Sequence, residues 1–349
     1  MKSPLTTHDQ VGPSTVIVKT LRTVFQYLLV LGVTATLLWF SLRSIDSGDG
    51  KSPVEFLATT WQQANKGYLL IMFLVTMISH VVRAVRWQML LVPAGHRISF
   101  IGAFLSLMTG YLVNLVVPRG GEITRSLNLY KLEKVPVDVS FGTVVVERVV
   151  DVICLLLLVM LSFWIEWDKL KVFMEGLPLG SGGSAIPGWL LPAIIGLLLL
   201  IPVFLLLRKN RKVRTFLEGF RNGLFSVFRL ERKGLFLFYS FSIWALYFVT
   251  SYWVIMAFEQ TASLGFGAVF TIFAIGSIAM AMPLPGGTGS YHTLVPLGLV
   301  TLYHLPKPDA VALVFIFHAV QTLILIVSGV LAALISWWLI RKKSTSMTN

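Results

Sequence analysis

Three charged residues, Glu147, Arg148 and Asp151, interrupt the apolar stretch 141–164. Each charge near the centre of a bilayer disfavours membrane insertion by roughly 2.5–3.5 kcal/mol. Charged residues there usually form ion pairs or belong to a functional site. Arg148 and Asp151 are three residues apart and Glu147 and Asp151 are four apart, so a helix brings them together. Two acids that share one arginine leave one acid able to hold a proton. We expect either a gating or proton-linked group here or a structural ion cluster.

Four arginines near the ends of apolar stretches have the chemistry to bind phosphate, because a guanidinium fork can hold a phosphate group at two points. Arg83 and Arg86 share a helix face directly before Trp87, and Arg119 and Arg125 flank a diglycine. We expect these four arginines to attract an anionic headgroup. The alternative for Arg83 and Arg86 is that they reach the cytoplasmic headgroup layer and set the topology.

Two loops rich in Gly and Pro interrupt the apolar pattern, one in each half of the chain. Neither residue type continues a helix well, because Gly favours open backbone states and Pro lacks an N–H group. Matched interruptions of this kind indicate the binding site of a transporter, although ordinary interfacial turns share the signature. The break residues are Pro118, Gly120, Gly121 and Glu122 in the first loop, and Pro283, Pro285, Gly286, Gly287 and Gly289 in the second.

Polar groups that could bind a ligand or change charge accompany each loop. If the first loop ends at a helix N-terminus, its open N–H groups beside Arg119 would form an anion site. His292 follows the second loop, and His318 lies in the last apolar segment, about where Glu147 lies in the first half. A histidine there could change charge near neutral pH, or it could be a hydrogen-bonded packing residue.

Composition places the whole chain in a membrane. It is 56% hydrophobic and 13% charged, with a mean hydropathy of +0.79, which predicts an all-α polytopic membrane protein of six to eight transmembrane helices. The net charge of +13 fits orientation and contact with anionic lipid better than nucleic-acid binding. The histidines show no metal spacing and no enzyme or nucleotide motif is present, so we expect no catalytic residue, metal or cofactor.

The apolar segments and the basic residues between them predict the topology. The connection 208–234 carries nine Lys and Arg residues and should be cytoplasmic, as should both termini. These assignments agree only if 100–117 and 266–282 are re-entrant rather than full spans. The predicted apolar segments lie near 24–42, 68–91, 100–117, 141–164, 189–207, 235–257, 266–282 and 309–339.

This topology makes 68–164 and 235–339 an inverted repeat whose broken segments converge near the membrane midplane. We expect a polar tail at 1–23, one integral-membrane domain over 24–340 and a basic tail at 341–349. The location would be the bacterial cytoplasmic membrane.

The order of these motifs resembles the lysylphosphatidylglycerol synthase transmembrane family, which includes the flippase-like domain of the multiple peptide resistance factor. The resemblance rests on Arg83-x-x-Arg86-Trp87, Pro118-Arg119-Gly120-Gly121-Glu122-x-x-Arg125, Glu147-Arg148-x-x-Asp151 and Pro283-x-Pro285-Gly286-Gly287-x-Gly289. It implies a role in moving lipid across the bilayer. We expect a stand-alone member without the soluble synthase domain, and His292 stands where we expect many members to carry a glutamate.

These patterns lead to one functional hypothesis and two alternatives. The hypothesis is a flippase or transporter for an anionic phospholipid or a polyprenyl-linked lipid. The first alternative is a membrane-embedded enzyme that uses Glu147, Asp151 or His318 for acid–base chemistry. The second is a scaffold for a separately encoded synthase or glycosyltransferase. The oligomeric state stays open.

Overall fold

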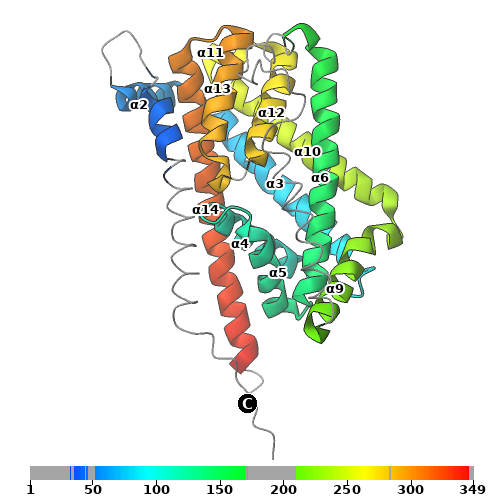
Figure 1. Ribbon diagram of the computed structural model, residues 1–349. Helices are drawn as coiled ribbons and strands as arrows, with labels where there is room; N and C mark the ends of the chain where they lie inside the picture. Colours follow the sequence, from blue (N-terminus) through cyan, green and yellow to red (C-terminus); the bar gives the residue numbers. More distant parts are fainter. Residues whose placement is uncertain are drawn as a thin grey trace, which may run out of the picture.

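The computed structural model describes residues 32, 35–43, 45, 52–169, 171, 210–282 and 284–345. The tail 1–23, the predicted segment 189–207, most of 24–34, Pro283 and residues 346–349 lie outside the described residues. The described part is helical, without strands, and forms one bundle (Figure 1). Its helices are α2 (Pro53–Gln63), α3 (Lys66–Leu91), α4 (Phe100–Asn114), α5 (Gly120–Glu133), α6 (Val137–Ile165), α9 (Arg211–Leu224), α10 (Lys233–Met256), α11 (Glu259–Ala262), α12 (Gly265–Ala281), α13 (Ser290–Tyr303) and α14 (Lys307–Thr345), with 3₁₀ turns η1 (Phe225–Arg229) and η2 (Pro285–Gly287).

Long apolar helices confirm the prediction of a polytopic helical membrane protein. Within the described residues, α3, α10 and α14 are long and apolar enough to cross a membrane. The 29-residue α6 coincides with the predicted segment 141–164. Side-chain caps define where two helices begin: Asn65 accepts hydrogen bonds from N–H groups of α3, and Ser99 accepts one from an N–H group of α4.

The two segments predicted to be re-entrant, 100–117 and 266–282, form the first helices of two helical hairpins. The 15-residue α4 and the 17-residue α12 rise about 22 and 26 Å, less than the hydrocarbon core of about 30 Å. Each is followed by a break and a second short helix, α5 or α13. The breaks touch, since Arg119 Nη2 donates to the Ala281 carbonyl oxygen at 2.9 Å. The α4–α5 hairpin occupies the lower half of Figure 1 and the α12–α13 hairpin the upper half.

The helices that carry the hairpins run in opposite directions through the bundle. At one end, the Asn65 N–H group at the start of α3 donates to Ala257 O after α10, at 2.8 Å. At the other end, Lys343 Nζ in α14 donates to Leu132 O in α5, at 2.7 Å. Thus α3–α4–α5–α6 and α10–α12–α13–α14 share one order of long, short, short and long helices, in opposite directions. An inverted repeat has this order; its placement in a membrane stays a prediction.

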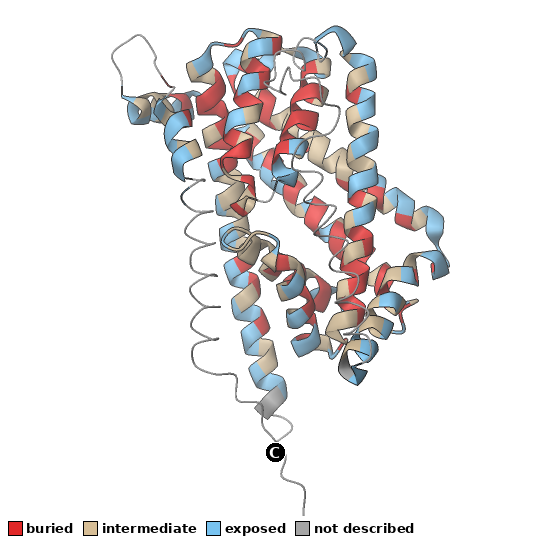
Figure 2. Cartoon of the chain, viewed as in Figure 1, coloured by how far each residue is buried: buried red, intermediate tan, exposed pale blue. Residues whose placement is uncertain are grey.

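The outer surface of the bundle is apolar and parts of its interior are polar. Large apolar side chains of α6, α10 and α14 are exposed, for example Leu157, Phe241 and Leu334, as Figure 2 shows for these helices. Inside, Gly110 and Gly121 let α4 and α5 approach closely, because a Cβ at Gly121 would lie 2.1 Å from Gly110 O. Such small-residue crossings are typical of membrane helices. An apolar exterior around polar buried groups fits a lipid environment.

Candidate functional site

A buried ion network joins the long helices of the first half to α10. Asp151 Oδ2 lies 2.8 Å from Arg83 Nη1, and Asp151 Oδ1 lies 3.0 Å from Arg86 Nη2. Arg83 Nη2 also donates to the Tyr247 hydroxyl at 3.1 Å, and Arg86 Nη1 donates to Ser240 Oγ at 3.2 Å. Because the arginines come from α3 and their partners from α6 and α10, the network fixes three helices against one another.

The innermost part of the network contains Glu147, whose side chain is 0% exposed. Its Oε2 lies 2.6 Å from Arg125 Nη1 and its Oε1 lies 3.4 Å from Arg86 Nη2. The Arg125 guanidinium also stacks on the Trp87 ring at 3.6 Å, and Trp87 Nε1 donates to Thr143 Oγ1 at 2.9 Å. A cation over an indole face is stabilised by the ring quadrupole.

The expectation that two acids share one arginine is wrong. Glu147 faces two arginines, and Asp151 faces Arg83, Arg86 and Arg148. Because the arginines come from α3, α5 and α6, sequence spacing along one helix could not reveal them. The network is therefore rich in arginine rather than in acid.

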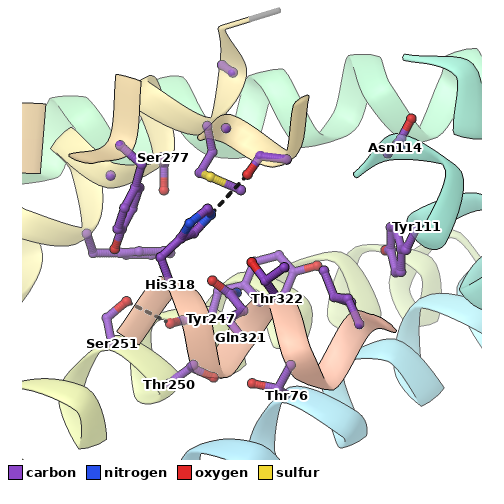
Figure 3. Close-up of a pocket in the computed structure, with 18 of the residues that line it drawn as sticks. Thr76, Tyr111, Asn114, Tyr247, Thr250, Ser251, Ser277, His318, Gln321 and Thr322 are labelled. Atoms are coloured by element: carbon purple, nitrogen blue, oxygen red, sulfur yellow. Dashed lines mark hydrogen bonds between the residues drawn. The ribbon is translucent and has the colours of Figure 1, made fainter. Parts of the chain in front are cut away.

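A cavity of about 470 Å³ lies between the two hairpin breaks, beside this network. Its walls come from α3, α4, α5, α6, α10, α12, α13 and α14 and from both break loops, as Figure 3 shows in part. Arg83, Arg119, Glu122, Arg148 and Asp151 form its charged end. Apolar groups form much of the remaining wall, including Val152, Leu155, Ile272, Phe273 and Leu325.

Arg148 is partly accessible at this charged end, with 36% of its side chain exposed, and Arg119 is exposed. Its contacts are long: Nε lies 3.4 Å from Glu122 Oε1, and Nη1 lies 3.6 Å from Asp151 Oδ2. By contrast, Arg86, Arg125 and Glu147 are buried behind the cavity wall and do not line it. The four headgroup arginines proposed from sequence thus separate into Arg83 and Arg119 at the cavity and two behind it.

The first break differs from the open amide loop that the sequence suggested. The α5 helix begins at Gly120, directly after Arg119 in a left-handed conformation (φ 61°). The Gly121 N–H group donates to Asn114 Oδ1 at 2.7 Å, and the Gly120 N–H group donates to Val117 O at 3.0 Å. These amides are bonded within the protein, so the guanidinium groups supply the positive charge at this loop.

The second break brings together the two histidines that the sequence singled out. His318 Nε2 lies 3.1 Å from the Gly286 carbonyl oxygen, and the rings of His292 and His318 lie 4.7 Å apart. Gly286, Gly287 and Gly289 all have positive φ, which explains why this turn uses glycine. His318 lines the cavity with Gly286 and Gly287, whereas His292, Pro285 and Gly289 do not, and Pro283 lies outside the described residues.

Sequence reasoning missed an uncharged polar wall of the cavity. Thr76 and His80 lie four residues apart on the face of α3 that also carries Arg83, and Trp244 and Tyr247 line the cavity from α10. The α3 spacing was a usable signal, since residues four apart share a helix face. The α10 residues gave none, because aromatic residues are ordinary in membrane helices.

No group of three or more His, Cys, Asp or Glu side chains in the described ranges could hold a metal ion. The site is therefore an arginine-rich cavity with apolar and uncharged polar walls.

Sequence comparison places this architecture in a family. The profile described as "Lysylphosphatidylglycerol synthase TM region" matches residues 24–329, most of the chain. The chain belongs to this family. No solved structure matches the chain significantly.

Two relatives of this chain come from Methanocaldococcus jannaschii. The UPF0104 membrane protein MJ1595 is 34% identical over 90 residues, which cover 25% of this chain and 27% of that protein. The UPF0104 membrane protein MJ1078 is 26% identical over 223 residues, covering 63% of this chain and 91% of that protein. The chain thus spans about a quarter of the first relative and most of the second. Both relatives are named as membrane proteins.

Proposed function

We propose that this chain binds a phosphate-bearing lipid in the cavity and moves it between the leaflets of the cytoplasmic membrane. One observation carries the proposal: a single cavity touches both hairpin breaks and combines arginine side chains with apolar walls. Broken helices that meet at a site are a recurring feature of alternating-access transporters. An anionic phospholipid or a polyprenyl-linked lipid has both a charge for the arginines and chains for the apolar wall.

Arg83, Arg119 and Arg148 are the groups that would receive the phosphate. Arg148 is the strongest candidate, because its contacts are long and its side chain is partly exposed to the cavity. Arg86 and Arg125 act from behind the wall, where their pairing with Glu147 holds α3, α5 and α6 in register.

Movement between leaflets requires the breaks to shift against each other. The Arg119 bond to Ala281 and the His318 contact with Gly286 are the direct links that such a shift would alter. We include His292, which packs against His318, in this gate. A separately encoded synthase or glycosyltransferase that supplies the lipid is part of the proposal.

Arg148→Ala tests the proposal. Loss of a charged hydrogen bond costs about 1.5–3 kcal/mol, so the lipid transfer rate should fall roughly tenfold or more. The measurement is quenching of fluorescent phosphatidylglycerol by an impermeant reductant in proteoliposomes. Arg214→Ala is the matched control, because Arg214 is exposed on α9 and pairs with Glu218 one helical turn away.

Two outcomes would contradict the transporter. Equal lipid transfer in wild-type and protein-free vesicles would contradict the proposed transfer activity. An unchanged transfer rate in Arg148→Ala would contradict the role assigned to Arg148. Chemical turnover of the labelled lipid without transfer would instead favour the membrane-embedded enzyme.

A further inference from the structure

The cavity wall contains buried polar atoms that the protein leaves without hydrogen-bond partners. Within the described residues, Thr76 Oγ1, both ring nitrogens of His80 and Trp244 Nε1 have no partner. All three residues line the cavity, and His80 is only 6% exposed. Buried polar groups are normally paired, because an unpaired one costs free energy. Their position at a cavity points to a ligand that supplies the missing partners.

These residues line the cavity from the two helices, α3 and α10, that also carry Arg83 and its partner Tyr247. Thr76 and His80 precede Arg83 on the same face of α3. On α10, Trp244 lies next to Tyr247, with ring centroids 6.2 Å apart, and the Tyr247 hydroxyl accepts from Arg83. A ligand whose phosphate contacts Arg83 can therefore place its next groups against Thr76, His80 and Trp244.

The polar side chains of this wall, Thr76, His80 and Trp244, are of uncharged types. They offer hydroxyl, indole and imidazole groups, and Figure 3 shows more neutral polar side chains nearby, among them Thr250 and Gln321. Two acids line the cavity, Glu122 and Asp151, against the three arginines Arg83, Arg119 and Arg148. A cationic headgroup would thus enter a cavity in which arginines outnumber acids, and like-charge repulsion disfavours this.

We propose that the wall formed by Thr76, His80 and Trp244 binds the hydroxyl groups of an uncharged polyol, a sugar or inositol-like ring, joined to the lipid through the phosphate. This inference rests on the proposed function and names the headgroup. It excludes a lipid with an aminoacylated, cationic headgroup as the preferred ligand.

The test compares lipids that differ only beyond the phosphate. Binding of phosphatidylinositol, phosphatidic acid and lysyl-phosphatidylglycerol to the full chain in detergent is measured by native mass spectrometry, and transfer of the same lipids is measured in proteoliposomes. Phosphatidylinositol should bind at least about tenfold more tightly than phosphatidic acid, since two or more neutral hydrogen bonds distinguish them. Lysyl-phosphatidylglycerol should bind most weakly.

Matched variants assign the preference to this wall. Thr76→Val keeps the side-chain shape and Trp244→Phe keeps a smaller aromatic ring, and both remove the polar atom. Each should lower the preference for phosphatidylinositol about fivefold without changing binding of phosphatidic acid. Thr301→Val is the control, because Thr301 is exposed on α13 and its hydroxyl bonds to Leu297 O of the same helix.

The outcomes separate this inference from the proposed function. Equal binding of phosphatidylinositol and phosphatidic acid, or a preference unchanged in both variants, would overturn the polyol site while transfer could persist. Tight, variant-sensitive binding without transfer would support the polyol site and overturn the transporter. Preference for lysyl-phosphatidylglycerol would overturn the inference directly.

Discussion

At the scale of single residues, Glu147 shows how a buried charge can be structural. Its carboxylate has no exposed surface and faces Arg86 and Arg125, which are also buried. Removing one partner of a buried pair leaves uncompensated charge, which costs more than the pair contributes. We therefore assign Glu147 to holding the arginines in place.

Glu147→Gln should be strongly destabilising. It leaves two buried guanidinium groups with less negative charge between them, so the expected loss is about 3–5 kcal/mol. This loss of stability is measured as a fall in the midpoint temperature of thermal unfolding in detergent. Glu218→Gln on exposed α9 is the control, with an expected loss of about 0.5 kcal/mol or less. Equal midpoints for the two variants would contradict a structural role for Glu147.

At the scale of elements, the hairpin α4–α5 depends on glycine at its crossing. Gly110 and Gly121 face each other so closely that a side chain at Gly121 would overlap Gly110 O and the Asn114 side chain. The same asparagine binds the Gly121 N–H group and so closes the break. This crossing determines where Arg119 and Glu122 enter the cavity.

Gly121→Ala should open this crossing. Overpacking of a tight contact costs about 1–3 kcal/mol, and the displaced break should also slow lipid transfer. Gly234→Ala is the control, because Gly234 lies in α10 with nothing near its Cβ position, where alanine favours the helix. Thermal unfolding compares the midpoint temperatures of the two variants, and proteoliposome assays compare their lipid transfer rates. A Gly121→Ala protein as stable as Gly234→Ala would show that the hairpin tolerates a wider crossing.

At the scale of the whole molecule, the two ends of the bundle differ in charge. One end, the basic end, contains α9, the end of α5 and the C-terminal turns of α14, at the bottom of Figure 1. Its Lys and Arg residues include Lys131, Lys134, Arg211, Arg214, Arg221, Arg229, Arg341, Lys342 and Lys343. The opposite end carries acids, among them Glu166, Glu259 and Asp309. The positive-inside rule predicts that the basic end faces the cytoplasm.

Cysteine labelling tests this orientation. In a Cys154→Ser background, Lys131→Cys should react with an impermeant maleimide only in inverted vesicles, and Lys307→Cys only in intact cells. Both positions are exposed, and they lie near opposite ends of the bundle. Labelling of both from the same side would contradict the opposed hairpins.

The sequence by itself determined the helical membrane class, most helix positions and both breaks, because apolar length and Gly/Pro chemistry are local properties. It also identified the residues of the ion network, since charges in apolar segments are conspicuous. Only the tertiary structure decided their partners: Arg86 and Arg125 lie behind the wall, Arg148 lies at the cavity, and Thr76, His80 and Trp244 line the same cavity. Pairing between helices depends on how they pack, and residues 68 positions apart, such as Arg83 and Asp151, carry no mutual signal in one sequence.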